Sequence, residues 1–163
     1  MLKERFKEVE NRLLSEIEQF YADRLISVAL FGSVARETQG FDSDIDVLII
    51  AKGLPHGRIR RIREFESVEK KVEPFLKSLR KERINTYISA IIKSPEEAEK
   101  GSPLFLDMVE DSKILFDRDN FFSGLIAQLR ARLKALGAKR VWKGSAWYWI
   151  LKPDIKAGEV FEV

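Results

Sequence analysis

The sequence predicts an α/β (α+β) fold in which helices pack largely on one face of a small mixed sheet. Short apolar runs rich in β-branched residues alternate with longer segments whose apolar residues recur every three or four positions. A chain of 163 residues can bury one hydrophobic core and is too short for two large domains. We therefore expect a single domain over residues 1–163, with a core over about 22–117 and a C-terminal helix and hairpin-like extension over 118–163.

Composition excludes several classes of protein. The chain has no cysteine, which excludes disulfides, thiolate catalysis and cysteine-based zinc sites. No apolar run approaches the roughly 20 residues of a membrane span, and the first residues, MLKERFKEVE, are too charged for a signal peptide. We therefore expect a cytoplasmic protein with no membrane partner. Charged residues make up 34% of the chain and amides are scarce, which is common in proteins of thermophiles.

The first half of the chain predicts two helices that flank two strands. Leu2 to Phe20 has one apolar and one charged face, which is typical of a helix packed on a sheet. Arg24 to Phe31 and Val47 to Ile50 are apolar runs that predict strands. Arg58 to about Lys81 predicts a long helix, which Pro74 should kink or split because proline lacks an amide hydrogen.

The second half begins with a predicted third strand, Ile84 to Ile92. The sequence Ser94-Pro95-Glu96-Glu97 then predicts a short helix that begins with a capping box. Another short helix should follow Ser102-Pro103, and Lys113 to Phe116 predicts a short edge strand.

The C-terminal part predicts a helix and a hairpin. The helix runs from Phe121 to about Leu136 and should be capped by Asp119 or Asn120. Lys143-Gly144 could turn a hairpin between the segments on either side, residues 139–142 and 146–151.

All three tryptophans lie in a stretch without acidic residues, 120–153. On a strand, Trp147 and Trp149 would point to the same side and could cover the preceding helix. Alternatively, they could stack on bases while neighbouring basic residues contact an RNA backbone. We favour packing, because short chains seldom expose several tryptophans.

Two features suited to phosphate and metal stand on either side of a polar loop. Gly32-Ser33 directly follows the first strand, where glycine permits a sharp turn and the start of a helix favours an anion. We expect Ser33 at the N-cap of that helix. Asp44 and Asp46 begin the second strand and should share one face, roughly 6.5 Å apart. Hard cations such as Mg²⁺ prefer carboxylate oxygens and also accept substrate phosphate.

Together these residues resemble the signature of the DNA polymerase beta-like nucleotidyltransferase superfamily, above all its small "minimal" archaeal and bacterial members. The resemblance is strong over Val28 to Ile50 and extends to about Asp117. It implies a nucleotidyltransferase fold and an enzyme that transfers a nucleoside monophosphate from a nucleoside triphosphate to an unknown acceptor. ATP is the expected donor.

The resemblance also implies roles for single residues. Asp44 and Asp46 would be catalytic and would hold Mg²⁺ or Mn²⁺. Gly32 and Ser33 would bind the nucleotide phosphates, and Arg36 would add a positive charge.

Two positions depart from the family pattern. Relatives often have glycine where this chain has Glu37. Active relatives usually carry a third acidic residue on the third strand, whereas this strand has none, and Asn85 or Ser89 could occupy the position without supplying charge. Acids that could serve instead are Asp107, Glu110 and Asp111.

Two alternatives follow from the missing acid and the basic extension. The chain could be a catalytically weak nucleotide-binding or antitoxin-like module whose partner protein is, for example, a helical toxin. It could also bind RNA, or direct the transfer to RNA, through its C-terminal extension.

Overall fold

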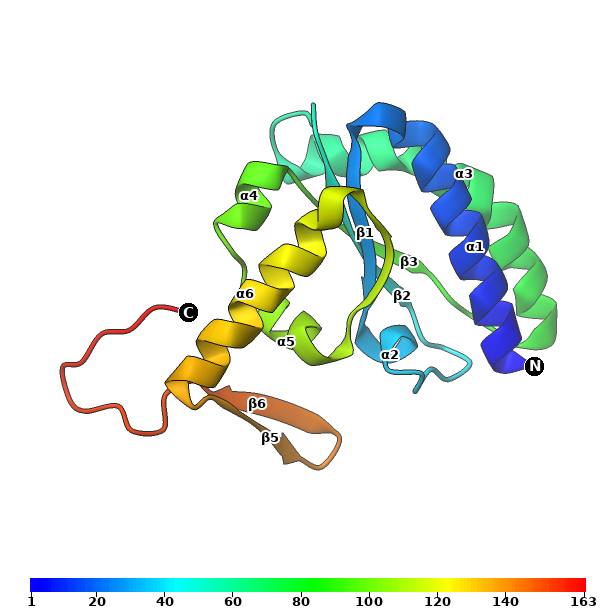
Figure 1. The fold of residues 1–163 in the computed structure, drawn as a ribbon. Helices are drawn as coiled ribbons and strands as arrows, with labels where there is room; N and C mark the ends of the chain where they lie inside the picture. Colours follow the sequence, from blue (N-terminus) through cyan, green and yellow to red (C-terminus); the bar gives the residue numbers. More distant parts are fainter.

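The computed structural model describes residues 1–163, and its centre is a four-stranded mixed sheet with the order β3-β2-β1-β4 (Figure 1). β1 (Leu25–Phe31) pairs antiparallel with β2 (Ile45–Ala51) and with β4 (Lys113–Asp117). β2 pairs parallel with β3 (Ile88–Lys93). This arrangement confirms the predicted small mixed sheet, with β4 at one edge.

The third strand is shorter than predicted, because residues 84–87 form a loop. Ile84 and Thr86 are both buried in this loop, each with 3% of its surface exposed. The alternation of the sequence therefore reflects burial without strand pairing. The loop is tied to the segment before β2, where the Asn85 amide donates a hydrogen bond to the carbonyl of Phe41 at 2.8 Å.

Helices cover both faces of the sheet, which corrects the expectation that they would lie largely on one face. Figure 1 shows α1 (Leu2–Tyr21) and α3 (Arg58–Leu79) on one side. The other side is covered by α5 (Leu104–Asp111) and α6 (Phe121–Leu136). None of the helices is both long and apolar enough to cross a membrane.

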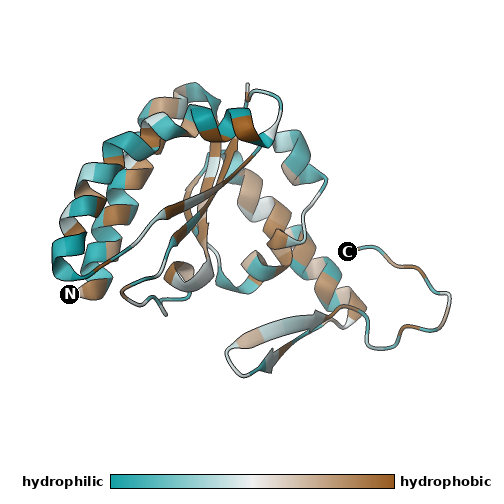
Figure 2. Cartoon of the chain, turned by 180° about the vertical axis from the view of Figure 1, so that it is seen from behind, coloured by the Kyte–Doolittle hydropathy of each residue, from teal (hydrophilic) through white to brown (hydrophobic).

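The reason for two covered faces lies in the central strands. Val28 and Leu30 belong to the core beneath α1 and α3, whereas Ala29 and Leu48 belong to the core beneath α5 and α6. A strand with apolar residues at successive positions must bury both of its faces. Figure 2 shows the hydrophobic residues, in brown, along the strands and on the inward sides of the helices.

Helix α3 is continuous across Pro74 and is not split. Val72 and Leu76 are buried on either side of the proline, with 1% and 4% of their surfaces exposed. We attribute the continuity to this packing, which offsets the one backbone hydrogen bond that proline removes. Figures 1 and 2 both show the helix curving over the sheet.

The starts of α4 (Pro95–Glu99) and α6 differ in how well the sequence predicted them. α4 has the predicted capping box between Ser94 and Glu97. The N-cap residue of α6 is Asn120, one of the two predicted positions, but its side chain makes no capping hydrogen bond. Instead the carboxylate of Asp117 accepts the amide hydrogens of Phe122 and Ser123 at 2.9 Å each. The two predicted caps, at 119 and 120, have φ angles of 52° and 55° and belong to the turn before the helix.

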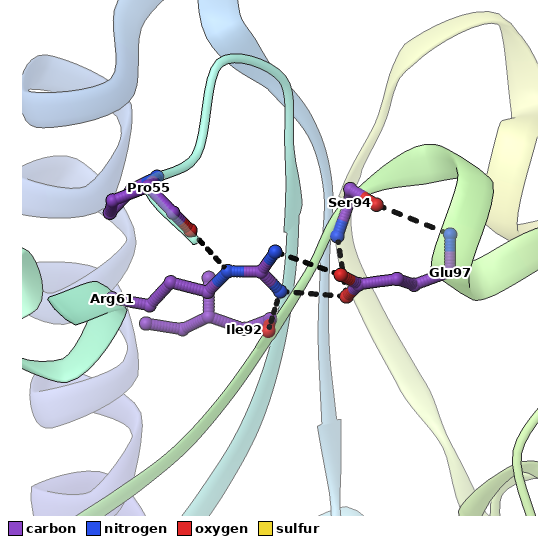
Figure 3. Close-up of polar contacts among 5 residues, drawn as sticks. All are labelled: Pro55, Arg61, Ile92, Ser94 and Glu97. Carbon is purple, nitrogen blue, oxygen red and sulfur yellow. Dashed lines mark hydrogen bonds and ion pairs between the residues drawn. The ribbon is translucent and has the colours of Figure 1, made fainter. Parts of the chain in front are cut away.

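A cluster around Arg61 joins the loop after β2, the end of β3 and α4 (Figure 3). The Arg61 guanidinium donates to both carboxylate oxygens of Glu97, at 2.7 and 2.8 Å. It also donates to the carbonyls of Pro55 and Ile92, at 3.0 and 3.3 Å. Glu97 in turn accepts the Ser94 amide, so one ion pair fixes three segments.

The C-terminal extension forms the predicted hairpin, β5 (Lys139–Lys143) paired antiparallel with β6 (Ala146–Ile150). Trp149 packs against the core beneath α5 and α6, as predicted. Trp147, by contrast, donates from its Nε1 to Asp107 of α5, at 3.2 Å. The remaining short helices are α2 (Gly32–Ala35) and the 3₁₀ turns Ala22–Arg24, Arg80–Glu82 and Arg118–Asn120.

Candidate active site

The predicted phosphate and metal residues lie at the same end of two neighbouring strands. β1 ends at Phe31 and passes directly into α2, which begins at Gly32. The antiparallel register places Phe31 opposite Asp46 on β2. The Gly-Ser turn and the pair of carboxylates are therefore adjacent in space although a loop separates them in sequence.

Gly32 is in close contact with Asp46. Its φ angle is +71°, a conformation that side chains with a Cβ rarely adopt. A Cβ at this position would lie 2.3 Å from Oδ2 of Asp46, which is closer than any nonbonded contact. Glycine thus allows both the turn and the approach of a carboxylate to the backbone.

The sequence predicted that Ser33 would cap the helix, but it does not. The N-cap residue of α2 is Phe31, no side chain caps the helix, and Ser33 is its second residue. The helix, whose first residue Gly32 has a left-handed φ, starts two residues earlier than expected. The carbonyl of Ser33 accepts the amide hydrogen of Thr38 at 2.9 Å, which closes the turn after α2.

The electrostatics of the site centre on Asp46, which is partly buried, whereas Asp44 is exposed. Burial raises the pKa of Asp46, the negative charge of Asp44 raises it further, and the positive charge of Arg36 opposes both. A partly buried carboxylate whose charge is disfavoured by a neighbouring carboxylate is suited to a divalent cation, which relieves the repulsion.

The strand beside Asp46 supplies no third acid. The parallel register of β2 and β3 places Ser89 beside Asp46. The structure contains no group of three or more acidic or histidine side chains that could hold a metal ion. Two carboxylates therefore fit one hard cation whose other ligands are substrate oxygens and water.

The other candidate acids are engaged elsewhere or exposed. Asp107 accepts the hydrogen bond from Trp147, and Asp111 forms an ion pair with Arg140 at 2.6 Å. Glu110 is exposed on the same helix. The structure thus gives two of the three acids of α5 a role in holding the hairpin.

Sequence reasoning missed one residue next to the site. The guanidinium carbon of Arg36 lies 4.7 Å from the centre of the Trp147 ring, so the hairpin reaches the end of α2. The only sequence signal was the accumulation of tryptophan and basic residues in the extension, which does not reveal a partner in the first 40 residues.

Comparison of the sequence with known proteins finds a matching family and a relative. A family model described as a nucleotidyltransferase domain matches residues 10–116. The chain is 34% identical over 128 residues, 77% of its own length and 82% of the other's, to a Methanocaldococcus jannaschii protein provisionally named protein adenylyltransferase MJ1305.

Two solved structures extend the comparison. The spectinomycin adenyltransferase AAD(9) from Enterococcus faecialis, solved with ATP and spectinomycin, matches with a TM-score of 0.54 at 15% identity, over 80% of this chain and 66% of that one. A toxin-antitoxin structure with AMP-PNP matches with a TM-score of 0.49 at 16% identity, over 78% of this chain and 92% of that one. At such identities the first likeness concerns the fold alone.

Proposed function

The chain belongs to the nucleotidyltransferase domain family, and from this membership we propose that it transfers the AMP part of ATP to an acceptor and releases pyrophosphate. The observation that carries the proposal is the contact of the Asp46 carboxylate with the backbone of Gly32, beside the exposed Asp44. This places metal-binding oxygens next to a turn that a triphosphate can approach.

The proposed roles follow from position and charge. Asp44 and Asp46 hold Mg²⁺ or Mn²⁺, which when bound neutralises charge on the triphosphate. Gly32 and Ser33 present backbone to the phosphates, since no Cβ stands at Gly32 to block the approach. Arg36 supplies a further positive charge at the end of α2.

We propose a protein side chain as the acceptor, on the basis of the name of the Methanocaldococcus jannaschii relative. Ser89 beside Asp46 supports a second candidate, a nucleotide-binding module with weak transfer that acts through a partner protein. Without a third carboxylate, the chain has less means of deprotonating an acceptor.

The two candidates are separated by measuring transfer and binding. The chain is incubated with α-labelled nucleoside triphosphates, Mg²⁺ or Mn²⁺ and cell lysate, and label is followed in protein and in RNA. We expect labelled protein with ATP, loss of label in Asp44→Asn and Asp46→Asn, and full label in Asp42→Asn, an exposed carboxylate before the pair.

The outcomes divide as follows. Metal-dependent ATP binding without label in any acceptor favours the second candidate. Label in RNA alone contradicts a protein acceptor. Labelling that both Asp44→Asn and Asp46→Asn leave unchanged would refute the assignment of the site.

A further inference from the structure

The β5–β6 hairpin lies outside residues 10–116, which match the family, and yet it contacts the candidate site. Figure 1 shows the hairpin passing beneath α5 with its tip toward α2. The ring of Trp147, on β6, faces the guanidinium of Arg36 at the end of α2, at 4.7 Å. A cation over an aromatic ring at this distance is an attractive contact.

The hairpin is held in this position by α5. Trp147 donates to Asp107, and Arg140 of β5 pairs with Asp111 at 2.6 Å. Asp107 and Asp111 are four residues apart and share one face of the helix. Both side chains of the Arg140–Asp111 pair are less than one fifth exposed, at 18% and 17%, so solvent screens this pair only in part. Two anchors one helical turn apart, one on each strand, fix the place and the direction of the hairpin that carries Trp147.

A ring differs from a carboxylate as a partner for arginine. A carboxylate would neutralise the guanidinium, whereas a ring restrains it and leaves its full charge available. Arg36 forms no ion pair in the structure, and its guanidinium lies over the Trp147 ring. An arginine side chain that is not restrained in this way loses rotamer entropy on binding phosphate, which the contact must offset.

We propose that Trp147 is a positioning residue that holds Arg36 ready for the triphosphate, so that the hairpin completes the nucleotide site. This inference rests on the proposed function and deepens it. It gives the C-terminal extension a role in binding the nucleotide donor, and not the role of a free aromatic surface on which nucleobases stack. The Trp147 ring is already engaged by Arg36, and Arg140 lies 5.4 Å from the same ring and 5.0 Å from that of Trp142.

The test measures equilibrium binding of ATP by calorimetry, in the presence of Mg²⁺ and without lysate. Trp147→Leu removes the ring and should weaken ATP binding about 3- to 10-fold, the size of one cation–π contact. Trp147→Phe keeps a ring but loses the bond to Asp107 and should stay within about 2-fold of the wild type. Tyr148→Leu, which alters a half-exposed aromatic residue that neighbours Trp147 on β6 and points to the opposite side of the strand, is the matched control and should bind normally.

A double-mutant cycle distinguishes positioning from a merely structural role. Arg36→Met should weaken binding by itself, and adding Trp147→Leu to it should cause no further loss. Independent, multiplying effects of the two substitutions, or normal binding by Arg36→Met, would overturn the inference. Far-ultraviolet circular dichroism and thermal melting of each variant confirm that the fold is kept, and Trp147→Met, which also lacks the ring, carries the test if Trp147→Leu does not fold.

The same assay separates this inference from the proposed function. Loss of binding in Asp46→Asn together with normal binding in Trp147→Leu refutes the role of Trp147 and leaves the proposed function intact. A wild-type chain that binds no ATP refutes both.

Discussion

Glu37 occupies a backbone position that suits glycine. Its φ angle is +58°, and its amide donates to the carbonyl of Val34 in the turn after α2. The family resemblance places glycine at this position, so the departure in sequence corresponds to a strained residue in the structure. The strain lies four residues after Ser33, which belongs to the turn that we assign to phosphate binding.

We expect Glu37→Gly to raise the melting temperature by about 2–4 °C, because relief of the left-handed strain exceeds the entropy cost of glycine. The exposed pair with Lys3, at 3.0 Å, contributes little and should not reverse the sign. Calorimetric melting measures the change. Glu37→Ala removes the same pair but keeps the Cβ, and a gain equal to that of glycine would contradict the argument.

Gly32 should tolerate no side chain. Gly32→Ala adds a Cβ 2.3 Å from the Asp46 carboxylate at a residue with positive φ, and we expect a loss of about 1–3 kcal/mol in unfolding free energy. Nucleotide transfer should be lost as well, since the carboxylate must move. Chemical denaturation and the labelling assay measure the two effects. Gly40→Ala, with no atom within 4 Å of the new Cβ, is the control and should change neither.

At the scale of single residues, we could predict from the sequence how residues close together in the chain are arranged, but not which residues far apart in the chain are in contact. Asp44 and Asp46 could be placed on one face because alternation along a strand is local. The contact of Gly32 with Asp46 depends on the pairing register of two strands, which the sequence did not specify residue by residue. The contact of Arg36 with Trp147 could not be predicted, because no period in the sequence encodes the docking of a hairpin on another element.

At the scale of secondary-structure elements, the start of α6 depends on a residue of the preceding strand. Burial raises the pKa of Asp117, but hydrogen bonds from Ser27 and from the amides of Ser123 and Phe122 outweigh it and hold the pKa below its ordinary value of 3.8. Asp117 thereby joins the edge strand, the central strand and the helix.

Asp117→Ala should lower the unfolding free energy by about 1–2 kcal/mol at neutral pH, as expected for a lost helix cap. Since the folded pKa is depressed, the stabilisation is complete above the unfolded pKa near 3.8 and disappears as pH falls through the folded value. Denaturation at several pH values should therefore show the wild type and the variant converging in acid. The control Asp119→Asn should unfold like the wild type, and a constant difference down to pH 2 would contradict the assignment.

Errors in predicting elements have a common physical cause. Pro74 and the loop residues 84–87, of which Ile84 and Thr86 are buried, were judged by local preference, whereas packing against the rest of the molecule decided both. The capping box at Ser94 was predicted correctly because both of its partners lie within one turn. The cap of α6 comes from outside the helix and its adjoining turn, which is beyond the reach of a local rule.

At the scale of the whole molecule, the Arg61 cluster closes the end of the sheet opposite the candidate site (Figure 3). Arg61→Lys keeps the charge but cannot form the two parallel bonds to Glu97 or the further bonds to two carbonyls. We expect a loss of about 1–3 kcal/mol, measured by denaturation, with ATP binding unchanged. The control Arg60→Lys alters an exposed neighbour and should be neutral, and equal effects of the two would contradict the role of the cluster.

The order of the strands also bears on how fast the chain folds. β1 meets β2 after a short loop, but it meets β4 only across most of the chain, as the bond between Ser27 and Asp117, 90 residues apart, shows. Closing so long a loop delays contact formation more than it lowers final stability. We expect β1, β2 and β3 to assemble with α1 and α3 before β4 and α6 dock. In stopped-flow experiments Asp117→Ala should then accelerate unfolding and leave the refolding rate almost unchanged, whereas a slowed refolding rate would mean that β4 joins the transition state.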